Sequence, residues 1–188
     1  MNTEELIRKI ISLGALKASR VRDDQIVLSS SFRDACVQNY CGGYGKTWVC
    51  PPACGEIETL MERVRSYPEG ILYQTVGRYE DSFDFESMAA ARRAHSALSR
   101  KIEEDLQTDL PEGRFHLSVG GCDLCTKCTW PEGQPCRFPG KALLSLEACG
   151  VDVYQTAKAA GLPYHNGPNT VTYFGLILFC QSSGKTEI

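Results

Sequence analysis

The sequence lacks the features that mark several classes of protein. It has 20 lysines and arginines against 23 aspartates and glutamates, so no basic excess points to nucleic acid or an anionic membrane. Its longest apolar stretch, around residues 173–179, is far shorter than the roughly 20 residues of a bilayer span. The first residues show no basic start followed by an apolar run, so we expect no signal peptide. These absences predict a cytoplasmic protein that binds neither nucleic acid nor membrane.

The common catalytic motifs are also absent. Residues 42–47 are rich in glycine, but Tyr40 stands where a phosphate loop requires its first glycine, so that motif fails. The sequence contains no Ser-His-Asp arrangement and no metalloprotease pattern. His95 is expected in the core, and neither His116 nor His165 has a recognisable partner. Catalytic residues are therefore unknown, and an electron-transfer or accessory role is favoured over a stand-alone enzyme.

Cysteine, in contrast, is abundant: 10 of the 188 residues. In a reducing compartment this number indicates metal ligation or redox chemistry more than disulfide bonds. The first group is Cys36, Cys41, Cys50 and Cys54, the second is Cys122, Cys125, Cys128 and Cys136, and Cys149 and Cys180 stand apart. Four and four thiols predict two metal sites. The two separate cysteines are expected to be small buried hydrophobic residues.

The second group carries the stronger signal. Cys122, Cys125 and Cys128 follow at intervals of three, a spacing that lets three thiolates wrap one iron–sulfur core while a fourth ligand comes from further away. A zinc site usually pairs one C-x2-C with a second, distant pair, so the third thiol is surplus to it. Residues 129–135 separate Cys136 from the others, so Cys136 either closes this cluster or serves the other. Cys50, which precedes a proline, is the alternative remote ligand.

The first group is looser and matches no common template. Glycines at residues 42, 43 and 45 let the chain between Cys41 and Cys50 fold back, while Pro51 and Pro52 stiffen it where two thiols must converge. A second metal site is predicted here.

The periodicity of apolar residues predicts an α/β or α+β fold, with a central mixed sheet, flanking helices and two cysteine-rich metal loops in one domain over residues 1–188. The expected helices are residues 3–13 with Thr3 as a cap, 57–64, 88–106, 142–149 and 152–160, and the expected strands are 25–28, 71–76, 115–119 and 171–180. Strand 71–76, the long helix and strand 115–119 should form a right-handed βαβ unit. The near-continuous apolar run of the last strand is typical of a central strand.

The second cysteine loop directly follows strand 115–119. It is therefore expected at the carboxyl end of that strand, the edge where ligands bind in open α/β sheets.

Three segments resemble a family of small prokaryotic proteins described only as predicted metal-binding proteins, a domain of unknown function. They are residues 41–52, residues 120–128 continued by 133–137, and residues 145–153. The resemblance implies metal binding at Cys36, Cys41, Cys50, Cys122, Cys125, Cys128 and Cys136. It leaves out Cys54 and Cys149, and it implies no reaction.

These observations favour an iron–sulfur protein with one or two [4Fe–4S] clusters that transfers electrons in anaerobic metabolism. The chain is much longer than a dedicated ferredoxin, which indicates a redox component that docks on a partner protein. One alternative is a structural zinc protein that acts as an interaction module. The other is a small cluster-dependent reductase.

Overall fold

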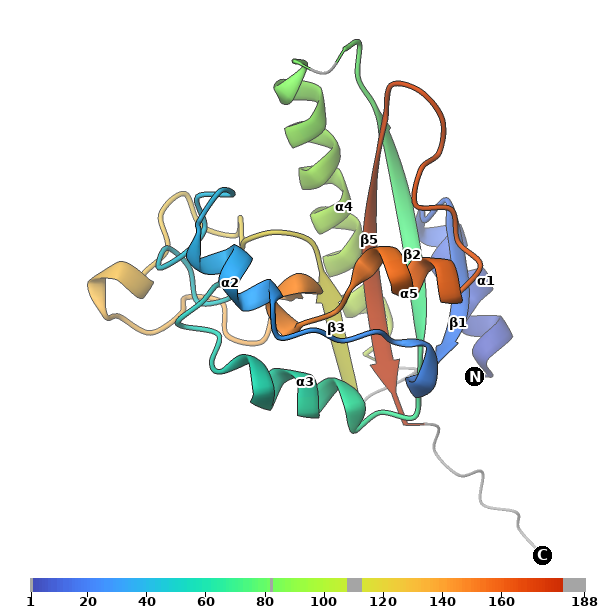
Figure 1. Ribbon diagram of the computed structural model, residues 1–188, viewed down its shortest axis with the longest axis horizontal. Coiled ribbons are helices and arrows are strands. Elements are labelled where there is room, and N and C mark those ends of the chain that lie inside the picture. The colour runs from blue at the N-terminus through green and yellow to red at the C-terminus, as the bar shows by residue number, and fades with distance from the viewer. Residues whose placement is uncertain (1, 82, 108–112, 181–188) are drawn as a thin grey trace, which may run out of the picture.

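The computed structural model describes residues 2–81, 83–107 and 113–180. Over these ranges the chain forms five α-helices and a five-stranded mixed sheet, which confirms the predicted fold class (Figure 1). The elements are α1 Thr3–Leu13, β1 Lys17–Arg22, α2 Phe32–Val37, α3 Ile57–Arg65, β2 Glu69–Arg78, α4 Phe85–Asp105, β3 Arg114–Ser118, β4 Leu144–Ser145, α5 Val153–Ala159 and β5 Thr170–Phe179. The strand order is β1-β2-β5-β3-β4.

Strand β5 is the central strand, as predicted. It pairs antiparallel with β2 on one side and with β3 on the other, so β2 and β3 are parallel to each other with β5 between them. Helix α4 connects these two parallel strands, but the predicted βαβ unit does not consist of neighbouring strands. Residues 174–179 of β5 are buried, because a strand with apolar side chains on both faces is stable only when both faces are covered.

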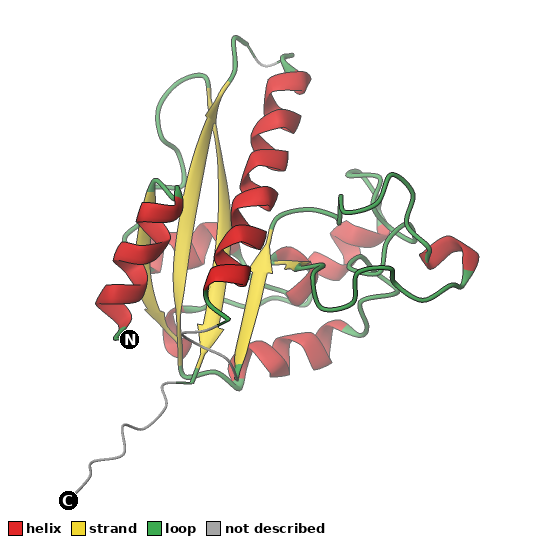
Figure 2. Ribbon diagram, turned by 180° about the vertical axis from the view of Figure 1, so that it is seen from behind, coloured by secondary structure: helices red, strands yellow, loops and turns green. Residues whose placement is uncertain are grey.

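Helices cover both faces of the sheet and enclose two apolar cores (Figure 2). On one face, α1 and α4 place Leu6, Ile10, Ile102 and Leu106 against the sheet. On the other face, α3 and α5 bury side chains such as Leu60, Val64 and Ala157 against the sheet. The same face buries Cys149, and burial raises the pKa of this thiol to about 12. Cys149 is thus the inert core residue that was predicted.

Several local predictions were wrong. The edge strand beside β2 is β1, whereas residues 23–25 form a 3₁₀ helix and only Leu28 of the predicted strand 25–28 makes an isolated bridge, to Val151. Of the β1 residues only Val21 is buried, and the others are partly or fully exposed, as expected of a strand at the edge of the sheet. Such a strand has no strong sequence signal.

The other differences lie near the cysteines and the helix ends. Residues 142–149 contain strand β4 and a 3₁₀ helix instead of the predicted α-helix, because β4 pairs parallel with β3. Asn2, not Thr3, caps α1 and accepts a hydrogen bond from the Glu5 amide at 2.9 Å. Cys180 follows β5 and is exposed, so the prediction that it is buried was wrong.

The fold places the two cysteine groups together at one end of the molecule. The first cysteine loop, defined as residues 36–54, runs from α2 toward α3, and the second, defined as residues 122–136, lies between β3 and β4. Figures 1 and 2 show both loops projecting beyond the β3 and β4 edge of the sheet. Within the described ranges, we find no helix with the length and apolarity needed to cross a membrane.

Candidate metal centre

The second cysteine loop surrounds a cavity of about 360 Å³. All four thiols predicted for this group line it: Cys122, Cys125, Cys128 and Cys136. The first cysteine loop contributes Lys46, Thr47 and Trp48 to the same wall. Local spacing explains why the three early thiols share one cavity, but the wall contributed by the first loop arises from tertiary contacts.

Short hydrogen bonds hold the second loop closed. The Thr129 hydroxyl donates to the Pro135 carbonyl oxygen at 2.9 Å, and Arg137 Nη1 donates to the Lys127 carbonyl oxygen at 2.8 Å. A 3₁₀ helix at residues 130–132 ends at Gly133, whose φ of 65° is left-handed and reverses the chain. These contacts bring the remote fourth cysteine back toward the first three.

The second loop is also attached to the body of the protein. Arg100 of α4 forms a salt bridge with Asp123 at 2.7 Å, and both side chains are largely shielded from solvent. This ion pair orients the start of the loop, between its first two cysteines, relative to α4.

The first cysteine loop is folded by its own backbone. Asn39 has a left-handed φ of 57°, and its side chain accepts a hydrogen bond from the Tyr44 amide at 2.9 Å. The Gly45 amide donates to the Pro51 carbonyl oxygen at 2.8 Å, and the Cys54 amide donates to the Cys50 carbonyl oxygen at 3.1 Å. The chain therefore folds back between the second and third thiols of this group.

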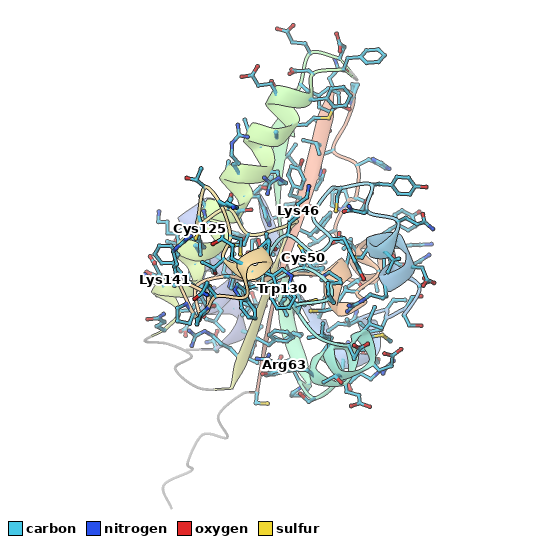
Figure 3. The ribbon with its side chains drawn as sticks, turned by 90° about the vertical axis from the view of Figure 1, so that its left-hand side faces the viewer. Lys46, Cys50, Arg63, Cys125, Trp130 and Lys141 are labelled. Carbon is cyan, nitrogen blue, oxygen red and sulfur yellow. The ribbon has the colours of Figure 1, made fainter. Side chains whose placement is uncertain are left out.

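Two tryptophans connect the loops. The rings of Trp48 and Trp130 meet edge to face with centroids 4.8 Å apart, and Trp48 Nε1 donates to the Thr129 hydroxyl at 3.3 Å. Figure 3 shows Lys46, Cys50, Cys125 and Trp130 on the same side of the molecule. The two cysteine loops thus form one continuous unit.

Cys50 lies at the junction of the two loops. A methyl group placed on Gly43 of the first loop would lie 3.2 Å from Cys50 Sγ, and one on Gly121, next to the second loop, would lie 3.5 Å from it. The same methyl on Gly43 would lie 3.6 Å from Cys41 Sγ. Glycine at both positions leaves room around this sulfur. Cys50, which the sequence offered as a ligand for either group, therefore lies near both of them.

Burial and mutual proximity make these thiols hard to ionise without a cation. Burial raises the pKa of Cys36, Cys50, Cys54 and Cys122, and neighbouring cysteines raise each of them further. The positive charge of Arg33 partly offsets the rise in the pKa of Cys36 and of Cys54. Because thiolates, not thiols, bind metals, binding would release protons and would be stronger at higher pH.

The four thiols of the second loop lie in the wall of a cavity. In residues 2–81, 83–107 and 113–180, no group of three or more Cys, His, Asp or Glu side chains is compact enough to hold a single metal ion. Four thiols in the wall of one cavity are a ligand set that metal centres in proteins use.

Cys54 has a different environment from the other predicted ligands. Its side chain packs against the apolar core that also contains Cys149, and Arg33 Nη2 lies 4.0 Å from its sulfur. Arg33 also donates to the Gly55 carbonyl oxygen at 2.8 Å. The eight ligands remain predictions, and Cys54 is the one whose contacts resemble those of a core residue.

A buried polar cluster that no sequence pattern indicated lies between the sheet and α4. His116 is paired after all: its Nδ1 lies 3.0 Å from Glu103 Oε2, and its Nε2 lies 2.8 Å from the Tyr73 hydroxyl. His95, expected in the core, is fully buried, and its Nδ1 lies 2.8 Å from the Thr75 hydroxyl. These residues come from β2, α4 and β3, so no local pattern could have linked them.

His95 is expected to make the protein less stable in acid. Burial, assisted by the nearby His116 and opposed by a hydrogen bond with the Phe174 backbone, lowers the pKa of His95 from its ordinary 6.5 to about 4. Between these pH values the unfolded chain binds a proton that the folded chain does not, so the free energy of unfolding rises with pH. This contribution is complete above about pH 6.5, is lost as pH falls toward 4, and amounts to about 3 kcal/mol.

The measurement is urea denaturation of the wild type and of His95→Phe at pH 7 and in mild acid. Phenylalanine keeps a ring beside Tyr73, whose ring stacks on His95 at 5.5 Å between centroids. Carboxylates such as Glu103 also lose stabilising contacts in acid, so only the difference between the two proteins reports His95. An equal pH dependence in both would contradict the prediction.

Comparison with known proteins gives one match. A family model described as "Predicted metal-binding protein (DUF2284)" matches residues 19–179, a range that includes both cysteine loops. No match to the chain was found among curated proteins or among solved structures.

Proposed function

The chain belongs to the family of predicted metal-binding proteins, and from this premise we propose that its cysteine loops hold iron–sulfur clusters and that it transfers electrons. The observation that carries the proposal is the cavity of about 360 Å³ with four thiols in its wall. Soft thiolate ligands suit iron and sulfide, and four cysteines are the usual ligand set of a [4Fe–4S] cluster.

The proposed ligands of the second loop are Cys122, Cys125, Cys128 and Cys136. Those of the first loop are Cys36, Cys41 and Cys50, with Cys54 as a fourth. A bound [4Fe–4S] cluster would supply a one-electron couple. The chain supplies the surroundings: Lys46, Lys127 and Arg137 line the cavity and would offset the negative charge of four thiolates.

The position of the loops supports exchange of electrons with a partner protein. Both project from the sheet edge, and Cys41 is exposed. Next to it, Tyr40 is 88% exposed, an aromatic side chain available for docking. We propose that the partner is a cytoplasmic redox protein and that the α/β body orients the loops toward it.

The test is anaerobic purification followed by analysis of iron, acid-labile sulfide and zinc, and by paramagnetic resonance before and after chemical reduction. We expect a brown protein with about four irons and four sulfides for each cluster and a signal that appears on reduction. A colourless protein with stoichiometric zinc and no sulfide would contradict the proposal and support the structural zinc module. Turnover of a small substrate by the loaded protein alone would support the reductase instead.

A further inference from the structure

The contact between the two cysteine loops centres on the Thr129 hydroxyl. This hydroxyl accepts a hydrogen bond from Trp48 Nε1 of the first loop at 3.3 Å and donates one to the Pro135 carbonyl oxygen of the second loop at 2.9 Å. A hydroxyl can donate and accept at the same time, so a continuous chain of hydrogen bonds joins the two loops. Thr129 is 6% exposed, so little water competes for these bonds.

Thr129 also lies between two of the ligands predicted for the second site. It directly follows Cys128, and Pro135 directly precedes Cys136. The hydrogen bond from Thr129 to Pro135 therefore closes the stretch that separates the third predicted ligand from the fourth. The Thr129 carbonyl oxygen accepts a further hydrogen bond from the Gln134 amide at 3.2 Å, which holds the same stretch closed through the backbone.

Trp48 has a corresponding place in the first loop. Its ring lines the cavity of the second loop and meets Trp130 edge to face, with centroids 4.8 Å apart. Along the chain it precedes Cys50, a predicted ligand of the first site, by two residues. The position of the Trp48 ring against the second loop thus constrains the backbone that carries a ligand of the first.

Cys50 provides a second connection between the sites. The glycines on either side of its sulfur, Gly43 and Gly121, belong to the first loop and to the approach to the second. Burial raises the pKa of the Cys50 thiol, and the nearby thiols of Cys41 and Cys128 raise it further. Its sulfur is therefore within electrostatic reach of a thiol from each group, and a change in either loop changes its surroundings.

Binding at one loop should help the other loop to bind. Folding of a loop and metal binding by its ligands are coupled, since thiolates that repel one another converge only around a cation. A loop held in its folded form offers its half of the contact between the loops, and that contact then stabilises the folded form of the other. Two loops that share one contact surface therefore fold more easily together than one at a time.

We propose that the contact between Trp48 and Thr129 couples the two cysteine sites, so that a cluster bound in one loop strengthens binding in the other. The inference rests on the proposed function. Neither side chain is a ligand: Trp48 acts through Cys50 and Thr129 through Cys136, so both are positioning residues. The coupling is reciprocal, and couplings of this kind usually change an affinity by about 5-fold to 150-fold.

The experiment counts the clusters on each chain when iron and sulfide are scarce. Metal-free protein receives, without oxygen, ferrous iron and sulfide for one cluster per chain, and native mass spectrometry follows the products until their distribution stops changing. Independent sites would leave about half of the chains or more with one cluster, whatever the two affinities. A coupling of about 100-fold between similar sites would reduce this fraction to about one tenth. We expect chains with no cluster or with two to predominate.

Two variants test the contact itself. Trp48→Phe keeps a ring against Trp130 but removes the N–H group, and Thr129→Val keeps the shape of the side chain but removes the hydroxyl. In both we expect the fraction with one cluster to rise from about one tenth toward one half. Excess iron and sulfide fill both sites whatever the coupling, so under that condition the variants should take up as much iron as the wild type. A purely structural defect would lower that total as well.

The matched control is Thr75→Val. Thr75 lies on β2, and its hydroxyl is 2.8 Å from His95 Nδ1, so the same substitution removes a hydrogen bond that does not involve the cysteine loops. This variant should keep the wild-type distribution. If Thr129→Val does not fold, Trp48→Phe decides the question, because the Trp48 side chain is only partly buried.

The outcomes separate the two proposals. A protein without iron and sulfide overturns the proposed function and this inference with it. A protein that carries clusters overturns this inference alone if it never takes up a second one, or if half of the chains or more carry one at limiting supply. A wild-type distribution in both contact variants, or an equal change in Thr75→Val, would show that Trp48 and Thr129 do not carry the coupling.

Discussion

Cys125→Ser is expected to remove all metal from the second cysteine loop. Cys125 is the middle thiol of its group and lines the cavity together with the other three. A hydroxyl is a poor ligand for iron and sulfide, so the site would be left with three soft ligands at most. Because metal binding is coupled to folding of the ligands' loop, the loop should also become less stable and more accessible to proteases.

The measurement is iron and sulfide content per chain after anaerobic purification, with limited proteolysis of the same samples. If both loops are loaded, the variant should lose about half of the iron of the wild type, and if only the second is loaded it should lose all. Cys180→Ser is the matched control, because Cys180 is exposed, follows β5 and belongs to neither group. Equal metal loss in the control would show that the ligand assignment is wrong.

Cys54→Ser separates the ligands of the first loop from its core residues. If Cys54 only packs against the core, as its contacts with that cluster indicate, the variant keeps its metal and loses some stability. Loss of metal would instead establish Cys54 as the fourth ligand of the first site.

Gly175→Ala is expected to destabilise the protein by about 3 kcal/mol, at the upper end of the range for overpacking a core. Gly175 pairs with Tyr73 across β5 and β2. A methyl group at this position would lie 2.2 Å from the Tyr73 hydroxyl oxygen and from the ring carbon that bears it. The ring has no free space to move into, because Tyr73 is 0% exposed and its hydroxyl contacts Ser99 and His116.

Urea denaturation of the variant and the wild type measures this effect. Gly161→Ala is the control: a methyl group there meets no atom within 4 Å, but the residue has a left-handed φ of 70°. Strain of that kind costs about 1 kcal/mol. A Gly175→Ala variant no less stable than this control would contradict the close packing of Tyr73 against β5.

The parts of the fold that sequence analysis predicted correctly are those with a strong periodic signal. The helix expected at residues 88–106 corresponds to α4, and the strand expected at 171–180 corresponds to β5, each within a few residues. In the first, apolar residues recur every three or four positions, and in the second the apolar run is nearly continuous. By contrast, β1 buries only Val21 and β4 has only two residues, so neither carries such a pattern, and pairing with β2 or β3 places them.

The candidate site also has a part that the sequence predicted and a part that it did not. The grouping of the eight thiols was evident from their spacing, because ligands three residues apart must lie near one another. The approach of the two loops was not evident, since it depends on contacts such as Trp48 with Trp130 that span about 80 residues of sequence. For the same reason, the buried cluster of His116, Glu103 and Tyr73 could not be predicted before the strands were placed.

By itself, the sequence determined that thiols dominate the chemistry of this protein, and it determined its mixed fold and the strand at its centre. All of these follow from interactions between residues close together in the chain. Only the tertiary structure decided that the two cysteine loops meet, that Cys50 lies between them, and that His116 pairs with Glu103 and Tyr73 in the core. Those features require side chains from separate strands and helices to converge, and that convergence comes from burying both faces of one sheet.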